Sequence, residues 1–281
     1  MTAASTDYIA QQSLADIQNL PDTRGLPLDN VGVKDIRCPI IVLDREAAKQ
    51  HTVASVNLSV SLPHHFKGTH MSRFVEILEN HRGELTMRTI PSLLEDMRRR
   101  LAAERARVEV RFPYFIRRAA PASGATALMD YQCWFIGERD DTSSDFVLGV
   151  EVPVTSLCPC SREISDYGAH NQRGHISIEV RPVRGSDEAP VLIWIEELIQ
   201  VAEGSASAPV YPLLKRVDER HVTMQAYDNP VFVEDMVRNV AVQLQDDIRV
   251  AWCSVRAVNQ ESIHNHNAFA AVEWTRPPHS I

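Results

Sequence analysis

At 281 residues, 44% hydrophobic and 23% charged, the chain has the composition of a globular protein with a sizeable core in one large domain or two smaller ones. Its formal net charge of −8 argues against general nucleic-acid binding. No apolar run reaches the length of a membrane span, and the N-terminal MTAASTDYIAQQ lacks the basic region and apolar core of a secretory signal. Five cysteines without framework spacing indicate a reducing compartment. We therefore expect a cytoplasmic protein that binds neither membranes nor nucleic acids.

The first forty residues carry scattered prolines, Pro21, Pro27 and Pro39, and little periodicity. Residues 1–40 therefore predict a surface arm. The arm is either a disordered tail or a segment that a partner subunit orders.

Beyond the arm, runs of alternating apolar and polar residues predict strands, and runs with a helical period predict helices. In the first half the predicted strands are 51–62, 107–118, 125–139 and 145–154, and the predicted helices start at residue 71 and cover 90–105. In the second half the predicted strands are 175–181, 249–258 and 268–274, the predicted helices are 191–206 and 231–246, and 215–219 form a charged loop. Strand pairs flanking helix pairs in both halves favour an α+β fold, with antiparallel sheets and helix pairs on one side, and suggest an internal duplication.

A polar loop lies between two predicted strands, with the sequence SLCPCSREISDYGAHNQRG over 156–174. It carries Cys158 and Cys160 on either side of a proline, and His170 follows twelve positions after Cys158. In an extended segment the two thiols would point the same way. A thiolate and an imidazole on one loop suit a metal site or a reactive thiol. The alternatives are small buried hydrophobic cysteines or a metal that only stabilises the fold.

Three further places carry candidate residues, each with a plainer alternative. His264 and His266 form a His-x-His pair that can meet one ion or one substrate if extended, or simply end a polar hairpin. Glu219 belongs to a charge run that is equally consistent with solvated surface. Glu234 lies one turn into a predicted helix, where the dipole favours a carboxylate in any case; it can also accept two hydrogen bonds from a planar amidine-like group.

Several long ordered stretches together resemble the type IB GTP cyclohydrolases. These stretches are SLCPCSREISDYGAHNQRGH, YPLLKRVDE, AYDNPVFVEDMVR, GTHMSRF and ESIHNHNAF. The resemblance runs from about residue 40 to the end of the chain. It implies the tunnelling fold, with tandem T-fold modules over 41–157 and 158–281 and a barrel that closes when a homotetramer assembles. It also implies active sites at subunit interfaces, and hydrolysis of GTP to formate and 7,8-dihydroneopterin triphosphate, the first step of folate and pterin biosynthesis.

The resemblance assigns a metal centre residue by residue. Cys158 of the CPC motif, His170 of YGAHN and Glu219 of KRVDE are the implied ligands. His264 and His266 of HNH are the implied acid–base or metal-proximal pair, which makes them catalytic residues together with Cys158. A mixed thiolate, imidazole and carboxylate shell accepts several divalent ions, so Zn, Mn or Fe is the expected cofactor.

The resemblance also assigns the substrate contacts. Glu234 of NPVFVED is the implied anchor of the guanine edge. Basic side chains are candidates for binding the triphosphate, although each is equally consistent with plain surface charge: Lys67, Arg173, Lys215 and Arg216.

Three other functions compete with this one. A nitrile reductase of the same fold would use a cysteine nucleophile and NADPH, but no clear nicotinamide-binding signature is present. A pterin- or purine-binding oligomer without catalysis would keep Cys158 as a structural ligand only. A zinc nucleobase deaminase would need the Pro-Cys-x-x-Cys and His-x-Glu motifs, which the sequence lacks.

Overall fold

The computed structural model describes residues 18, 20–186 and 188–277 of the chain. Most of the first half of the predicted arm therefore lies outside the described residues. The elements of the first half, in chain order, are β1 (Leu28–Asp44), β2 (Ala48–Leu62), α1 (Met71–Asn80), β3 (Gly83–Glu84), α2 (Ile90–Leu101), β4 (Ala106–Ala119), β5 (Thr126–Arg139) and β6 (Ser144–Leu157). Those of the second half are α3 (Pro159–Ile164), β7 (Asn171–Pro182), α4 (Ile195–Gly204), β8 (Ala208–Pro209), α5 (Arg216–Asp228), α6 (Val233–Asp246), β9 (Val250–Gln260) and β10 (Ala268–Thr275).

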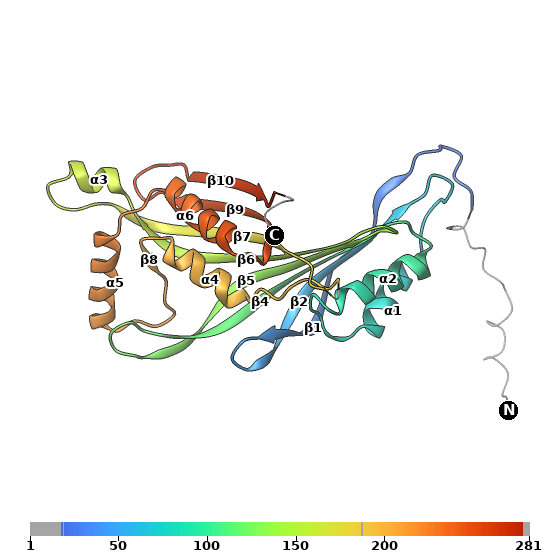
Figure 1. Ribbon diagram of the computed structural model, residues 1–281, viewed down its shortest axis with the longest axis horizontal. Helices are drawn as coiled ribbons and strands as arrows, with labels where there is room; N and C mark the ends of the chain where they lie inside the picture. Colours follow the sequence, from blue (N-terminus) through green and yellow to red (C-terminus); the bar gives the residue numbers. More distant parts are fainter. Residues whose placement is uncertain (1–17, 19, 187, 278–281) are drawn as a thin grey trace, which may run out of the picture.

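Within the described residues all the strands join one sheet, in the order β10-β9-β7-β6-β5-β4-β2-β1-β3, with β8 paired to β6 (Figure 1). The long neighbours are antiparallel throughout. Strands β2, β4 and β7 alternate more buried and more exposed positions, as a sheet with one covered face requires. On the covered face, α2 packs on β4 and β5, α4 on β6, and α6 on β9 and β10. The predicted α+β class, with helices on one side of an antiparallel sheet, is confirmed.

The core lies between this sheet face and the helices. Helix α2 buries one stripe, Leu93, Leu94 and Met97, at helical spacing. Helix α6 buries Met236 and Val240 in the same way. In the part of the chain that the structure describes, no helix combines the length and the apolar character that crossing a bilayer requires.

The predicted arm ends earlier than residue 40. Strand β1 begins at Leu28, so 28–40 belong to the sheet and pair with β2. The alternation that marks a strand is broken there by a register shift between Val33 and Ile36. Within the shift, Asp35 has φ 60°, and its backbone N–H donates to Asn57 Oδ1 at 2.8 Å. A bulge of this kind hides the two-residue period.

The proposed division at 157/158 falls at the end of β6 inside the continuous sheet, and it stays a prediction.

One short-range expectation was wrong, and one condition stated above is not met. The predicted charged loop over 215–219 is the first turn of α5, which buries only Asp218 and Ala226 and so shows no apolar stripe. The segment after Cys158 is not extended but forms α3. The other predicted elements are present with shifted ends; α6, for example, starts at Val233 rather than at 231.

Candidate functional site

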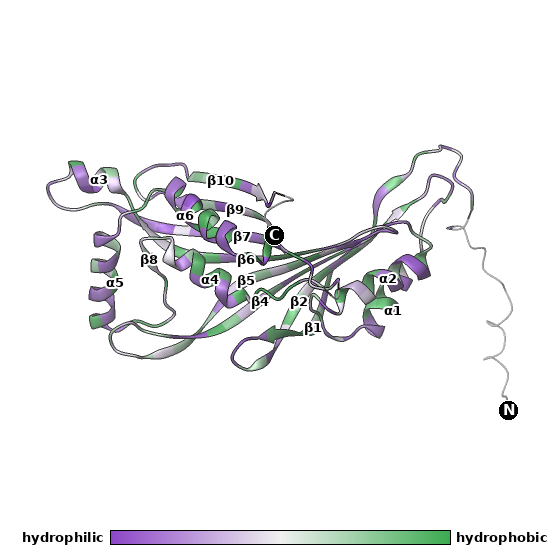
Figure 2. Cartoon of the chain, viewed as in Figure 1, coloured by the Kyte–Doolittle hydropathy of each residue, from purple (hydrophilic) through white to green (hydrophobic). Residues whose placement is uncertain are grey.

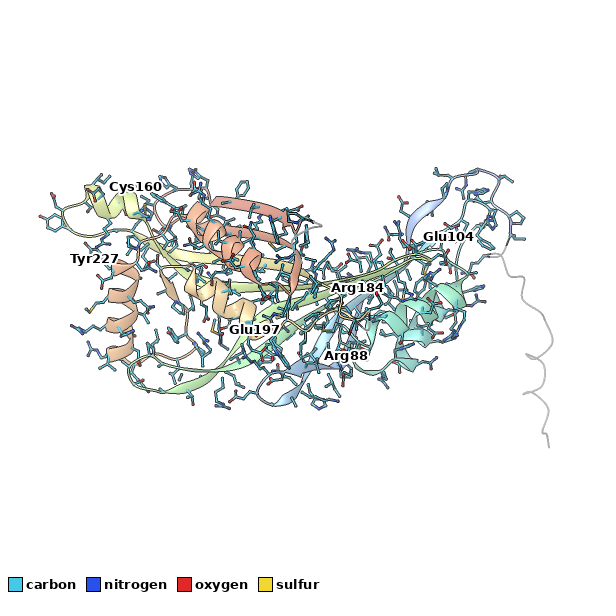
Figure 3. The ribbon with its side chains drawn as sticks, viewed as in Figure 1. Arg88, Glu104, Cys160, Arg184, Glu197 and Tyr227 are labelled. Atoms are coloured by element: carbon cyan, nitrogen blue, oxygen red, sulfur yellow. The ribbon has the colours of Figure 1, made fainter. Side chains whose placement is uncertain are left out.

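Cys158 lies at the junction between a strand and a short helix. It is the N-cap of α3, and its Sγ accepts a hydrogen bond from the Ser161 backbone N–H at 3.5 Å. Pro159 follows at the first helical position, where its missing N–H costs nothing. Cys158 is half-buried, whereas Cys160 is exposed on α3 (Figure 3). The two thiols therefore do not share an extended segment, and they differ in their surroundings.

Hydrogen bonds close the loop that begins at Cys158 and ends at His170. The Cys158 backbone N–H donates to the His170 carbonyl at 3.2 Å. The His170 backbone N–H donates to Ser161 Oγ at 3.2 Å, and that hydroxyl donates to the Cys158 carbonyl at 3.1 Å. The predicted thiol and imidazole, twelve positions apart in the sequence, thus start from adjacent points of the backbone.

A buried glutamine orients the His170 ring. Nδ1 of His170 lies 2.7 Å from Oε1 of Gln172, and Nε2 of Gln172 donates to Oε1 of Glu261 at 3.4 Å. Because the Glu261 carboxylate can only accept, the amide of Gln172 turns its oxygen toward His170. In the neutral ring, Nδ1 of His170 then carries the hydrogen, and Nε2 keeps its lone pair for a ligand.

The His-x-His pair lies on the loop between β9 and β10. His264 and His266 are both exposed, and their rings stack with centroids 5.1 Å apart and an interplanar angle of 15°. The same loop carries Glu261, which binds Gln172, and Ser262, whose Oγ lies 3.4 Å from His170 Nδ1. The structure therefore brings the loop of the pair against the loop of His170.

Glu234 belongs to a helix whose entry lies against the end of β6. It is exposed in the first turn of α6. The entry to that helix is tied to the end of β6: the Val231 N–H donates to the Leu157 carbonyl at 3.1 Å, and the buried Ser156 hydroxyl donates to the Val231 carbonyl at 3.3 Å. The predicted guanine anchor and the predicted metal thiol thus lie at one end of the sheet.

Glu219 lies at the same end of the sheet as Cys158, but on a different helix. It is exposed on the first turn of α5, about 12 Å along the helix axis from Tyr227. Tyr227 lies beside α3 (Figures 1 and 3), with the Arg162 guanidinium 4.7 Å from its ring centroid. Among the described residues, no three His, Cys, Asp or Glu side chains are grouped closely enough to hold a metal ion. One chain thus brings Cys158 and His170 together but does not add Glu219 to them.

The basic candidates fall into two groups. Arg173 on β7, with Lys215 and Arg216 at the start of α5, is exposed at the Cys158 end of the sheet. Lys67 follows the end of β2. The end of β2 pairs with the start of β4, the start of β4 with the end of β5, and the end of β5 with the start of β6. Lys67 therefore lies at the end of the sheet where β6 begins. Since Cys158 follows the end of β6, Lys67 lies about 45 Å away, one strand length along the sheet. Within one chain it is remote from the other candidates.

The sequence reasoning missed Gln172 and Asp218. Gln172 continues the inward alternation of β7, which was the available signal for its burial. Asp218 is completely buried, and its neighbours in sequence suggested only solvated charge. Burial raises the pKa of Asp218, but hydrogen bonds from Ser123, Lys215 and Ala122 outweigh burial and hold that pKa below its usual range.

Comparison with known proteins agrees with this geometry. Residues 14–270 match the family model described as type I GTP cyclohydrolase folE2. The chain belongs to the FolE2 family of type I GTP cyclohydrolases. It is 54% identical over 260 residues to GTP cyclohydrolase FolE2 of Syntrophus aciditrophicus, covering 92% of this chain and 99% of that protein. It is 55% identical over 265 residues to GTP cyclohydrolase FolE2 of Syntrophotalea carbinolica, covering 94% and 96%.

The fold of this FolE2 family member is also found in urate oxidase. A hyperthermostable mutant of the urate oxidase from Bacillus sp. TB-90 superimposes with a TM-score of 0.51 over 89% of this chain and 99% of that one, at 10% sequence identity. At that identity the likeness shows the tunnelling fold alone. The fold class predicted from the resemblance is confirmed at this level.

The donor set of this FolE2 chain fits a divalent metal ion, as expected for a metal-dependent family. The half-buried Cys158 offers a soft sulfur, and His170 offers Nε2 while Gln172 holds Nδ1. Ligating histidines in metalloproteins characteristically donate their other ring N–H to a fixed acceptor. Two of the three predicted ligands thus start from adjacent backbone positions in one chain.

Proposed function

We propose that this protein is a GTP cyclohydrolase I. Two waters open the imidazole ring of GTP and release C8 as formate, and one water leaves as the new ring closes, giving 7,8-dihydroneopterin triphosphate. The single observation that carries the proposal is the identity of more than half of the residues to FolE2 proteins over nearly the whole chain. The gathering of Cys158, His170 and Glu234 at one end of the sheet supports it. The product would enter folate biosynthesis, a cytoplasmic pathway.

The metal ligands in this proposal are Cys158, His170 and Glu219. A divalent ion held there, Zn, Mn or Fe, would lower the pKa of a water toward neutrality and so supply the nucleophile for C8. Gln172 and Glu261 support this site by fixing the tautomer of His170. The Cys158 thiol is held at the N-cap of α3 by the Ser161 N–H.

Recognition of the guanine falls to Glu234. Its two carboxylate oxygens can accept from N1–H and from the exocyclic amino group, a paired arrangement that distinguishes guanine from adenine. Its exposure in the first turn of α6 leaves both oxygens accessible to a ligand. The adjacent Asp235 is instead engaged by Arg238 at 2.9 Å, and so is not a second candidate.

Proton transfer to the purine falls to His264 and His266. Addition of water to C8 places electron density on N7, and a protonated imidazole nearby stabilises that step by donating its proton. The stacked arrangement of the two rings on an exposed loop keeps both available to a substrate. The same pair can deliver and remove the further protons that ring opening and reclosure require.

Assembly completes the site in this proposal. Lys67 is remote from Cys158 within one chain, and Glu219 is not grouped with the other two ligands. We therefore assign the active site to subunit interfaces of a homotetramer, in which edge strands β1 and β10 pair between subunits to close the barrel. Both edges are available for this, because β1 is covered by β3 at Ile40 and Ile41 only, and β10 pairs on one side only.

The direct test is incubation of the purified protein with GTP and Mn²⁺. The expected result is release of formate together with a pterin that fluoresces after oxidation. Cys158→Ala in the same assay is the control, and it should give neither product while keeping the oligomer. Wild-type protein that releases no formate with Mn²⁺, Zn²⁺ or Fe²⁺ would refute the proposal. Oxidation of NADPH with a deazaguanine nitrile would support the reductase instead.

A further inference from the structure

Helix α5 is capped by Lys215 and carries Arg216 and Glu219, yet very little hydrophobic surface holds it in place. Its buried residues are Asp218 and Ala226 only. Two of its apolar side chains, Val217 and Met224, are exposed, and Figure 2 shows most of the helix as hydrophilic. Helices in proteins are normally fixed by burial of an apolar face. Something else must therefore set the position of α5.

The buried carboxylate of Asp218 supplies that fixed point. One oxygen accepts the backbone N–H groups of Ala122 at 2.8 Å and Ser123 at 2.7 Å. The other accepts the Ser123 hydroxyl at 2.6 Å and the Lys215 backbone N–H at 2.8 Å. One side chain thus joins the start of α5 to the turn between β4 and β5, about ninety-five residues earlier in the chain.

That turn is itself closed, so it can act as a rigid support. The Ala120 N–H donates to the Ala125 carbonyl at 2.8 Å, and the Gly124 N–H donates to the Ala120 carbonyl at 3.1 Å. Gly124 has φ 70°, a conformation that glycine adopts without a steric penalty. At its far end α5 has a second support, where Arg162 lies over Tyr227. The helix is therefore held at both ends, by Asp218 at the end that carries the functional residues.

We propose that Asp218 is a positioning residue, whose carboxylate fixes the first turn of α5 to the β4–β5 turn and so sets where Glu219 meets the metal ion. This inference rests on the proposed function, because it needs Glu219 as a ligand. Asp218 and Glu219 are adjacent, so any displacement of the buried carboxylate moves the exposed one with it. Lys215 moves as well, since its backbone N–H is one of the four donors.

The alternative is that Asp218 contributes only to stability, and the chain offers a matched control for it. Asp140, half-buried in the turn between β5 and β6, also accepts four hydrogen bonds, but all of them come from within its own turn. They come from the N–H groups of Thr142 and Ser143 at 2.7 Å each and from their hydroxyls at 2.9 Å each. Asp140 follows β5, whereas Asp218 binds the turn that precedes β5, so the two lie at opposite ends of one fourteen-residue strand.

The experiment compares Asp218→Asn, Ser123→Ala and Asp140→Asn in the full-length protein. Asparagine keeps the shape of the side chain, but its amide NH₂ must face a donor, either the Lys215 N–H or the two turn N–H groups. Ser123→Ala removes one of the four bonds and keeps the rest. The measurements are the binding of Mn²⁺ alone, hydrogen exchange of the α5 amides, and GTP turnover as a function of Mn²⁺ concentration.

We expect Asp218→Asn to weaken Mn²⁺ binding by about 10–100-fold, the usual effect of losing a residue that orients a metal ligand. Its α5 amides should exchange faster, and saturating Mn²⁺ should restore much of the turnover. Ser123→Ala should shift Mn²⁺ binding in the same direction by a smaller factor. Asp140→Asn should leave Mn²⁺ binding unchanged.

Equal losses of Mn²⁺ affinity in Asp218→Asn and Asp140→Asn would overturn the inference, because they would show an effect of general stability. Unchanged Mn²⁺ affinity in both Asp218→Asn and Ser123→Ala would also overturn it. In either case wild-type turnover of GTP would remain. Failure of the proposed function is a different result, in which the wild type itself neither binds Mn²⁺ nor releases formate.

Discussion

Nδ1 of His170 lies 2.7 Å from Oε1 of Gln172, and the amide nitrogen of that glutamine donates to Glu261. This contact links two loops that are about ninety residues apart in the sequence. It also decides which nitrogen of the imidazole is free to bind a ligand, because a hydrogen on Nδ1 leaves the lone pair on Nε2. The chemistry of His170 is therefore determined by a residue that does not itself need to touch the substrate.

We expect Gln172→Ala to weaken Mn²⁺ binding by about 10–100-fold, because His170 loses the acceptor that holds its ring and tautomer. Equilibrium dialysis against Mn²⁺ measures this directly. Gln132→Ala, at an exposed position of β5, is the matched control and should bind Mn²⁺ like the wild type. Equal affinity in Gln172→Ala and the wild type would contradict a supporting role for the glutamine.

The two cysteines of the CPC motif should behave differently. Cys158 is half-buried at the N-cap of α3, and Cys160 is exposed at the second position of that helix. We expect Cys158→Ala to lose bound metal and to lower GTP turnover by at least about 100-fold, since a ligand is removed. Cys160→Ala should retain both the bound metal and the GTP turnover of the wild type. Size-exclusion chromatography verifies that each variant keeps its assembly, and turnover of Cys158→Ala at the wild-type rate would remove the thiolate from the mechanism.

The elements that the sequence predicted well are those whose burial follows a simple period. The strands β2 and β4 to β7 alternate between covered and open faces, and α2 and α6 present one apolar stripe. Helix α5 lacked this signal because a buried carboxylate, rather than an apolar face, anchors it. Part of β1 lacked it because a bulge interrupts the alternation.

In the candidate site, too, local sequence patterns predicted some residues, whereas others depend on contacts between distant segments of the chain. Motif resemblance predicted Cys158, His170 and Glu234 as site residues. Backbone hydrogen bonds at the end of β6 join Cys158 to His170 and join Leu157 to Val231, at the entry to the helix of Glu234. No local pattern marked Asp218, because its partners Ala122 and Ser123 lie in a distant turn. The distance between Lys67 and Cys158 likewise follows from strand register and not from either segment alone.

Glu234 and Asp235 provide a test of guanine recognition. We expect Glu234→Ala to raise the KM for GTP by about 10–150-fold, the effect of losing hydrogen bonds to a charged group worth about 1.5–3 kcal/mol. Mn²⁺ binding should change little, since Glu234 is not a proposed ligand. Asp235→Ala, which removes only the exposed pair with Arg238, should leave KM near the wild-type value. A normal KM for Glu234→Ala would exclude the anchor role.

Acid stability should depend on Asp140. Hydrogen bonds from the backbone and hydroxyl of Thr142, and then from Ser143, hold the pKa of this carboxyl below its usual range. The folded chain therefore takes up this proton only at a lower pH than the unfolded chain. The group stabilises the fold at pH values above the ordinary aspartate pKa of about 3.9, and this contribution is lost as the pH falls below that value.

The stability difference between wild type and Asp140→Asn should thus be constant near neutral pH and should narrow below about pH 4. Urea titrations monitored by fluorescence at a series of pH values measure it. A difference that is the same in acid and at neutral pH would mean that the asparagine variant loses packing rather than the ionised carboxylate. Because all four hydrogen bonds to Asp140 come from Thr142 and Ser143 in its own turn, the substitution should displace none of the proposed ligands. GTP turnover by Asp140→Asn at neutral pH should therefore match the wild type wherever the variant is folded.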